Sequence, residues 1–314
     1  MSEIHQIEPT SLKHLVGMPS VTAQVEVALE AAFADGKKFD DALLTGPPGC
    51  GKTQTAKVIA AEMASGFHEV LGQSVRSAAD LNALLLSAQD RDVVLIDEAH
   101  ELPKLQQTAL YLALDQKRIG IGGKSRSVES IPLANFTLLL ATTDEFLILQ
   151  PLRDRMKLCL RFGFYTEADI ATLTLQRSRG LEWQVEGRVF PEIAKRARGT
   201  PRLALRLLQA ARRVCRSEGD SRITLENLER ACLLENTDDL GLGITEQQYL
   251  RILLGGDSRL NVIASRLGLH SRTISAVTEP ILLRLGLIAK DEQGRRQLTA
   301  QGRIHLQSER PEGA

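Results

Sequence analysis

The stretch TGPPGCGKT at residues 45–53 contains the residues best suited to do chemistry, because it fills every fixed position of the pattern G-x-x-x-x-G-K-[ST]. Glycines in such a loop let successive backbone N–H groups point at a phosphate, and a helix that begins there adds its dipole. Lys52 can reach β- and γ-phosphate oxygens, and the Thr53 hydroxyl can bind Mg²⁺. The pattern therefore predicts a nucleotide site.

Such a loop needs a strand before it and a helix after it. Residues 42–44 (ALL) are short and apolar, and residues 54–63 (QTAKVIAAEM) place Ala56, Ile59 and Ala60 on one helical face. A chance Gly/Pro turn before an amphipathic helix is the alternative. It is disfavoured because strand, loop, Lys-Thr pair and helix all agree.

Two carboxylates follow the next apolar run, residues 92–98 (DVVLIDE), which predicts a buried parallel strand with Asp97 and Glu98 at its carboxyl end. Open parallel sheets place their chemistry beyond the carboxyl ends of the strands, beside the phosphate loop. Asp97 can then hold Mg²⁺ through its water shell, and Glu98 can polarise an attacking water. A helix N-cap pair is the alternative, and the upstream phosphate loop favours the catalytic interpretation. Residues 99–101 then open a predicted helix that runs through Leu114.

Further polar side chains follow a third predicted strand, residues 135–140. Thr142 or Thr143 could hydrogen-bond a γ-phosphate or the water, although hydroxyls at a strand end often only cap the next helix. Arg153 and Arg155 come soon after and are expected just beyond the core sheet. They form either a solvated helix face or an arginine finger, a guanidinium delivered to the γ-phosphate of a neighbouring subunit.

Composition sets the broad class. The 314 residues are 43% apolar and 25% charged, which describes a soluble globular protein long enough for two or three domains. Lys+Arg and Asp+Glu both number 39, so the net charge is zero and any nucleic-acid site must be local. The four cysteines share no C-x-x-C spacing and are expected to be reduced, without a metal. No signal sequence or membrane-length apolar run is present, so we expect a cytoplasmic protein.

The remaining pattern predicts further elements. A turn and N-cap at residues 17–20 should precede a helix, a β-hairpin with a basic, glycine-containing tip should span residues 117–136, and an acidic connector should span residues 236–243. Arg202 follows Pro201 at a helix start and is suited to reach back to nucleotide. The predicted helices cover residues 21–33, 81–88, 168–179, 190–198, 201–216, 225–234, 246–254, 260–267 and 271–285.

The last three helices, with a hairpin at residues 287–298, predict a winged helix. Basic residues cluster in its last helix, in its hairpin and just after it: Arg272, Arg284, Lys290, Arg295, Arg296 and Arg303. Winged helices bind nucleic acid or protein, and this cluster moderately favours nucleic acid.

Taken in order, these motifs resemble the RuvB family of branch-migration motors of the Holliday junction, within the AAA+ ATPases. The resemblance covers the chain from about Leu12 to Leu306. The motifs that carry it are GPPGCGKT at 46–53, IDEAH at 96–100, FTLLLATT at 136–143, PLRDR at 151–155, FY at 164–165, RGTPRLALRLL at 198–208 and the TEP, GLI and GR segments near the carboxyl end.

The resemblance implies roles for individual residues. ATP and Mg²⁺ would be bound by Gly49, Cys50, Gly51, Lys52, Thr53 and Gln54, with Asp97 and Glu98 as the Walker B acids and Thr142/Thr143 as sensor 1. Arg153 and Arg155 would form the trans-acting arginine motif, and Tyr165 and Arg202 (sensor 2) would be further nucleotide contacts. Lys290 and Arg295, with the inserted Arg296, would contact DNA.

Several positions depart from the family. Ile7-Glu8 replaces a Leu-Arg pair near the adenine site, Gly17-Met18 replaces Gly-Gln, and Glu101 stands where the family has Arg. The hairpin carries Asp291 and Glu292 where the family is basic. These changes fit a divergent paralogue as well as a housekeeping member.

We therefore predict an α/β AAA+ P-loop NTPase with a parallel-sheet ATPase domain (residues 1–165), a small helical lid (166–238) and a winged helix (239–314). The expected activity is ATP-driven movement of duplex DNA, with four-way junctions as substrate, a hexameric ring as the assembly and a RuvA-like protein as partner. A clamp-loader or initiator-like AAA+ switch and a nucleotide-gated winged-helix regulator remain alternatives.

Overall fold

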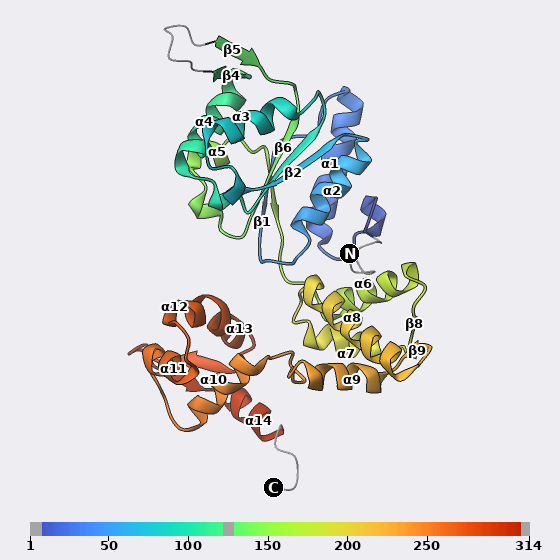
Figure 1. Ribbon diagram of the computed structural model, residues 1–314, viewed down its shortest axis with the longest axis vertical. Helices are drawn as coiled ribbons and strands as arrows, with labels where there is room; N and C mark the ends of the chain where they lie inside the picture. Colours follow the sequence, from blue (N-terminus) through green and yellow to red (C-terminus); the bar gives the residue numbers. More distant parts are fainter. Residues whose placement is uncertain (1–7, 122–128, 309–314) are drawn as a thin grey trace. The chain divides into compact units, whose positions relative to one another are not determined.

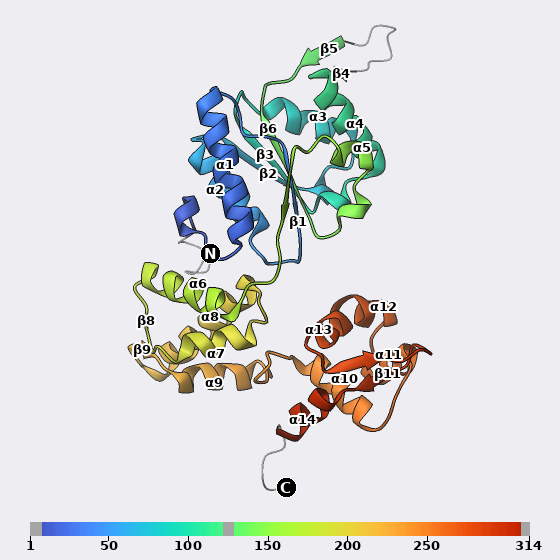
Figure 2. The same ribbon diagram turned by 180° about the vertical axis from the view of Figure 1, so that it is seen from behind.

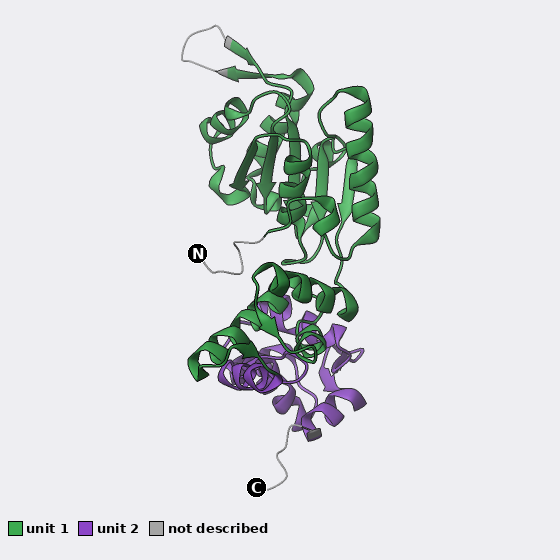
Figure 3. Cartoon of the chain, turned by 90° about the vertical axis from the view of Figure 1, so that its right-hand side faces the viewer, with its two compact units in different colours: residues 1–224 green, residues 225–314 purple. Residues whose placement is uncertain are grey.

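The computed structural model describes residues 8–121 and 129–308 of the chain. It divides into two compact units, residues 1–224 and 225–314 (Figure 3). This division does not test the three predicted domain ranges, which stay a prediction. Ile7 lies outside the described residues, as does the predicted hairpin tip with Gly122, Gly123, Lys124 and Arg126.

A five-stranded parallel sheet in the order β2-β3-β6-β1-β7 forms the centre of the first unit. Its strands are β1 (Ala42–Thr45), β2 (Phe67–Leu71), β3 (Val93–Asp97), β6 (Thr137–Thr142) and β7 (Leu158–Arg161). The three inner strands are the three that the apolar runs predict. They are flanked on both sides, so nearly every residue in them is buried.

Alternate residues of the inner strands pack into two separate cores. In β3, Val93 and Leu95 face one core, and Val94 and Ile96 face the other. Helices α1 (Pro19–Asp35) and α2 (Lys52–Glu62) cover the first face, and α3 (Ala78–Ser87), α4 (Lys104–Gln116) and α5 (Gln150–Arg153) cover the second, as Figures 1 and 2 show from opposite sides. The sheet is thus a rigid layer between two helical layers.

Two local expectations were wrong. Helix α1 is capped by Met18 in a left-handed conformation, and it includes Ser20 instead of beginning after it. The helix expected from Ala99 to Leu114 is broken into a 3₁₀ turn, η4 (Ala99–Glu101), and helix α4. The break has a physical cause, since Leu102 precedes Pro103 and a residue before proline is driven toward extended backbone.

The sheet also continues further than expected. Strand β7 follows Arg153 and Arg155 and pairs with β1, so these arginines lie between two strands of the sheet and not after it. The predicted hairpin is present as β4 (Arg118–Ile121) and β5 (Glu129–Pro132), and it projects from the sheet layer in Figure 1.

A helical subdomain completes the first unit. It contains α6 (Glu167–Gly180), α7 (Val189–Arg196) and α8 (Pro201–Glu218), with a short parallel pair, β8 (Gln184–Val185) and β9 (Arg222–Ile223). Thr166 and Asp169 form a capping box at the start of α6. This cap fixes the chain where it leaves the sheet, directly after Tyr165.

The second unit contains the predicted winged helix. It begins with α9 (Leu225–Leu234) and continues with α10 (Ile244–Leu254), α11 (Leu260–Leu267), a helical stretch made of α12 (Ser271–Thr273), the π-helical η6 (Ile274–Thr278) and α13 (Glu279–Arg284), then β10 (Ile288–Lys290), β11 (Arg296–Leu298) and α14 (Ala300–Ser308). Tyr249, Ile263, Leu282 and Leu298 are among the residues of its core. The sequence pattern missed α14.

Within the described part of the chain, no helix is both long and apolar enough to cross a bilayer.

Candidate functional site

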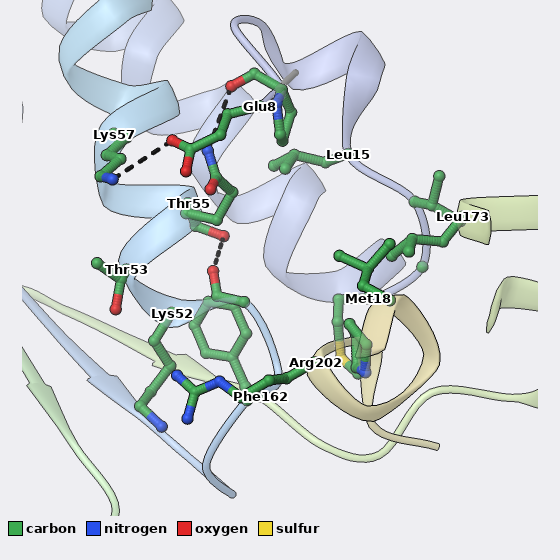
Figure 4. A pocket seen from close by; sticks show the side chains of 18 of the residues that line it. Glu8, Leu15, Met18, Lys52, Thr53, Thr55, Lys57, Phe162, Leu173 and Arg202 are labelled. Atoms are coloured by element: carbon green, nitrogen blue, oxygen red, sulfur yellow. Dashed lines mark hydrogen bonds and ion pairs between the residues drawn. The ribbon is translucent and has the colours of Figure 1, made fainter. Parts of the chain in front are cut away.

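A cavity of about 1120 Å³ opens beside the phosphate-binding loop of the first unit. Its wall includes residues 48, 49 and 51–55 of the loop and of the helix that follows it, and Asp97 and Glu98 from the end of β3. Tyr165, which precedes the helical subdomain, and Arg202, which belongs to it, complete this wall. Lys52, Thr53 and Arg202 are among the side chains labelled in Figure 4. Residues 8–10 and 14–18 close another side. Segments far apart in the sequence therefore meet around one cavity large enough for a nucleotide.

Lys52 lies at the floor of this cavity with only 6% of its surface exposed. Its ammonium group donates to the carbonyl oxygens of Gly46 (2.8 Å) and Pro47 (3.0 Å), which holds it over the loop. Burial lowers the pKa of Lys52, the carboxylates of Glu98 and Asp97 oppose that change, and the positive charge of Arg202 adds to it. Figure 4 shows Arg202 extending across the cavity toward Lys52.

Thr53 and Asp97 are brought together although 44 residues separate them. The Thr53 hydroxyl donates to Asp97 Oδ2 at 2.7 Å, and Asp97 Oδ1 accepts the backbone N–H of Glu98 at 2.9 Å. A hydroxyl and a carboxylate are hard oxygen ligands of the kind that Mg²⁺ prefers. The pair predicted to hold the metal thus forms one cluster at the cavity wall.

Tyr165 and Arg202 contact the loop directly. The Tyr165 hydroxyl donates to the carbonyl oxygen of Cys50 at 3.4 Å, and the Arg202 N–H donates to that of Gly49 at 3.4 Å. Burial raises the pKa of Tyr165 to about 12, so this hydroxyl stays protonated as a donor. Tyr165 thus contacts the loop through its side chain and Arg202 through its backbone.

Gly46 shows how closely the loop is packed. Its φ is 147°, and a Cβ placed there would lie 2.3 Å from the carbonyl oxygen of Phe162. Only glycine fits this approach. The loop is therefore clamped against the chain segment that leads into the helical subdomain.

Two other predicted contacts differ in kind. Gln54 lines the cavity, and its side-chain amide donates to the carbonyl oxygen of Pro9 at 3.4 Å. The Cys50 side chain is fully buried in the core beneath the loop, so this residue meets the cavity side only through its backbone. Glu8 lies at the cavity wall and pairs with Lys57 at 3.3 Å (Figure 4).

Neither Thr142, the last residue of β6, nor Thr143, which follows it, lines the cavity. The Thr143 hydroxyl is 3.4 Å from Glu98 Oε2, whereas Thr142 is fully buried and its hydroxyl oxygen accepts the Asp144 N–H at 3.0 Å. His100, which sequence reasoning placed only at a helix start, contacts both Thr142 and Glu98. Its Nδ1 is 3.0 Å from Thr142 Oγ1 and 3.4 Å from Glu98 Oε2.

Arg153 and Arg155 do not line the cavity of their own chain, and they differ from each other. Arg155 is engaged, since its guanidinium pairs with Asp115 and lies 4.8 Å over the Tyr111 ring. Arg153 lies 5.6 Å over the exposed ring of Phe146, and its Nε has no hydrogen-bond partner among the described residues. Among the described residues, Arg153 is therefore held by fewer contacts than Arg155.

In the second unit, the three predicted DNA contacts are not equivalent. Arg296 is 12% exposed and forms hydrogen bonds of 2.6 and 3.1 Å with Glu279, and Lys290 pairs with the same carboxylate at 3.0 Å. The Tyr249 hydroxyl donates to it as well, at 2.8 Å. Arg295 is exposed at the turn, where Asp291 accepts its backbone N–H.

AAA+ ATPases have a phosphate loop after one parallel strand, paired acids after another, and a helical lid that returns to the loop. This chain has all three features and is an AAA+ ATPase. Family models for the Holliday junction DNA helicase RuvB P-loop domain, the RuvB AAA lid domain and the RuvB C-terminal winged helix domain match residues 7–162, 165–238 and 239–307. The chain belongs to the RuvB family.

Individual relatives agree over nearly the whole length. The chain is 36% identical to Holliday junction branch migration complex subunit RuvB 2 of Synechococcus sp. (strain JA-3-3Ab), over 92% of this chain and 80% of that protein. It is 35% identical to the RuvB subunit of Anaeromyxobacter sp. (strain Fw109-5), over 98% and 92%. The solved Thermotoga maritima RuvB Holliday junction branch migration motor superposes with a TM-score of 0.80 at 32% identity, covering 97% of this chain and 99% of that one.

Proposed function

We propose that this protein hydrolyses ATP in the cavity described above and uses the energy to move duplex DNA at four-way junctions during recombination and repair. Its relatives are named as subunits of the Holliday junction branch migration complex. The observation that carries the proposal is the Thr53–Asp97 hydrogen bond of 2.7 Å beside Glu98, in the same cavity as Lys52. A passive nucleotide-binding site has no need of a second carboxylate at that place.

The roles follow from position. Backbone N–H groups of Gly49, Cys50 and Gly51 and the ammonium group of Lys52 would bind phosphate oxygens. Thr53 and Asp97 would hold Mg²⁺, which neutralises charge on the phosphates when bound. Glu98, whose carboxylate borders the cavity, would accept a proton from the attacking water. Thr143 would help to orient that water, and Gln54, Tyr165 and Arg202 would complete the nucleotide site.

The arginines that line the cavity are Arg177, Arg202 and Arg206, whereas Arg153 and Arg155 lie elsewhere. We propose that Arg153 reaches the nucleotide of a neighbouring subunit, and that Asp115 and Tyr111 hold Arg155 as its support. An arginine supplied in trans can accelerate phosphoryl transfer about 10³–10⁵-fold. This role requires an oligomer, for which a hexameric ring with domains at residues 1–165, 166–238 and 239–314 in each subunit is the proposed form.

DNA contacts are proposed for the winged helix, with Arg295 as the freest of the three predicted cations and Lys290 beside it. Each phosphate contact contributes a slope of about −0.9 in log affinity against log salt, so a single subunit should bind weakly and a ring more strongly. The β4–β5 hairpin is proposed as a contact for a RuvA-like junction-binding partner. A cytoplasmic location is proposed because DNA is the substrate.

The test is to measure ATP turnover and strand exchange of the full-length protein, with and without a four-way junction, alongside its mass in solution. We expect an oligomer with junction-stimulated turnover and continuous branch migration. One turnover per loading event would favour a clamp-loader or initiator-like switch. Negligible turnover together with tight, sequence-specific binding to duplex DNA would favour a regulator.

A further inference from the structure

His100 lies in a position that neither the phosphate loop nor the metal pair explains. It belongs to the 3₁₀ turn η4, directly after strand β3, and its side chain is 17% exposed. One ring nitrogen, Nδ1, contacts two groups from different strands: Thr142 Oγ1 at 3.0 Å and Glu98 Oε2 at 3.4 Å. The ring therefore connects the end of β3 to the end of β6.

The backbone of Glu98 is already fixed by other contacts. It has a left-handed conformation (φ 49°, ψ 48°), and its N–H donates to Asp97 Oδ1. A Cβ placed on Gly72 would lie 2.5 Å from the Glu98 carbonyl oxygen, so the neighbouring segment packs tightly on it. What these contacts leave free is the direction of the Glu98 side chain, which is 40% exposed.

Two side chains set that direction, and both contact the same oxygen. Glu98 Oε2 lies 3.4 Å from His100 Nδ1 and 3.4 Å from Thr143 Oγ1. Thr143 is exposed, whereas His100 is braced by its shorter contact with buried Thr142. His100 is therefore the better anchored of the two.

The neighbours of Nδ1 also favour one tautomer of the ring. An unprotonated Nδ1 would direct a lone pair at a carboxylate oxygen, which is repulsive. A hydrogen on Nδ1 can be donated to Thr142 Oγ1 at 3.0 Å, while Glu98 Oε2 lies 3.4 Å from the same nitrogen as an ion-pair contact. Thr142 remains anchored in turn because its oxygen accepts the Asp144 N–H.

We propose that His100 is a positioning residue for ATP hydrolysis, in which its Nδ1–H ties the Glu98 carboxylate to the end of strand β6. This inference rests on the proposed function, since it assigns a means of holding the group that activates water. A displacement of a reacting group by about 1 Å can cost about 10²-fold in rate. Loss of the Nδ1–H should therefore lower kcat about 30- to 100-fold and leave ATP affinity within about threefold, because His100 does not line the cavity.

The decisive comparison is between two amides of different length. Asparagine places its side-chain N–H₂ where the histidine Nδ1 is, whereas glutamine reaches toward the Nε2 position. We expect His100→Asn to keep kcat within about fivefold of the wild type, and His100→Gln to lose about as much as His100→Ala. A purely structural role predicts no such order.

The experiment measures kcat, KM and the dissociation constant for ATP in the full-length protein and these three variants. His68→Ala is the matched control, because His68 Nε2 also pairs with a carboxylate, Asp92 at 2.9 Å, on an edge strand outside the cavity. We expect this control to keep its kcat.

Each outcome decides a different question. Inactive wild-type protein that still binds ATP would overturn the proposed function itself. Active wild-type protein with His100→Gln as active as His100→Asn would overturn the role of His100 alone. If His100→Ala fails to bind ATP through misfolding, the asparagine–glutamine comparison still decides, because both variants retain a polar side chain.

In a Glu98→Gln background, adding His100→Ala should change single-turnover rates less than about threefold. A full additional loss of rate would show that His100 acts independently of Glu98.

Discussion

The second unit should lose stability when the partners of the buried Glu279 carboxylate are removed. Glu279 is 1% exposed and accepts hydrogen bonds from Arg296, Lys290 and Tyr249. Removing the partner of a buried charge costs about 3–5 kcal/mol when nothing compensates it. Lys290 still compensates partly in Arg296→Met, so we expect a loss near the lower limit, about 3 kcal/mol. Lys290 is 41% exposed, and Lys290→Met should cost less than about 1 kcal/mol.

Hydrogen exchange of the full-length protein, read by mass spectrometry over α10, is the suitable assay. A loss of about 3 kcal/mol corresponds to roughly 150-fold faster exchange through global opening of the unit, and 1 kcal/mol to about fivefold. Peptides from α6–α8 serve as the internal control and should not change. Arg296→Met combined with Glu279→Gln should recover part of the loss, because the unpaired charge is gone. Equal, small effects of Arg296→Met and Lys290→Met would refute this account of Glu279.

Three further outcomes are expected. Burial raises the pKa of Glu279, but hydrogen bonds from Arg296, Tyr249 and Lys290 outweigh burial and leave the pKa below its ordinary 4.5. The stability that the lowered pKa contributes is fully present above pH 4.5 and is lost as the pH falls through the folded-state pKa. Unchanged protection of α10 from hydrogen exchange in acid would contradict this expectation. Glu98→Gln should bind ATP normally and lose turnover at least about 100-fold in a steady-state assay, and retention of more than a few per cent would remove Glu98 from its role. Arg153→Ala and Lys52→Ala, each inactive alone, should regain part of the ATPase rate when mixed, unless the arginine acts within its own subunit.

The sequence predicts those parts of the fold whose signal is local. Residues 92–98 carry a continuous apolar run because β3 is buried on both faces, and residues 260–267 form a helix with the predicted bounds. Strands β2 and β7 were missed because they form the edges of the sheet, where polar residues such as His68 and Arg161 interrupt the apolar pattern. An edge strand needs no continuous apolar run, so nothing local distinguishes it.

Prediction of the functional site from the sequence is likewise limited to residues with a local signal. The loop at 46–53 and the acids at 97–98 follow from spacing alone, and the structure brings Thr53 and Asp97 into contact. The role of His100 depends on which residues of β3 and β6 lie side by side, which is a matter of sheet register. Likewise, Arg296 looks like a free DNA-binding cation in the sequence, and only folding shows its pairing with Glu279, which is 17 residues away. Long-range pairing decides both cases.

The contact between Gly46 and Phe162 has a consequence for which segments of this molecule must fold together. The phosphate loop takes its shape from the segment that joins the sheet to the helical lid, with Tyr165 and Arg202 holding its other carbonyl oxygens. A chain that ends at residue 161 would keep every residue of the loop motif and lose Phe162, against which Gly46 packs. The loop and residues 162–165 therefore pack as one unit, and exchange of lids between relatives should succeed only when both are exchanged with them.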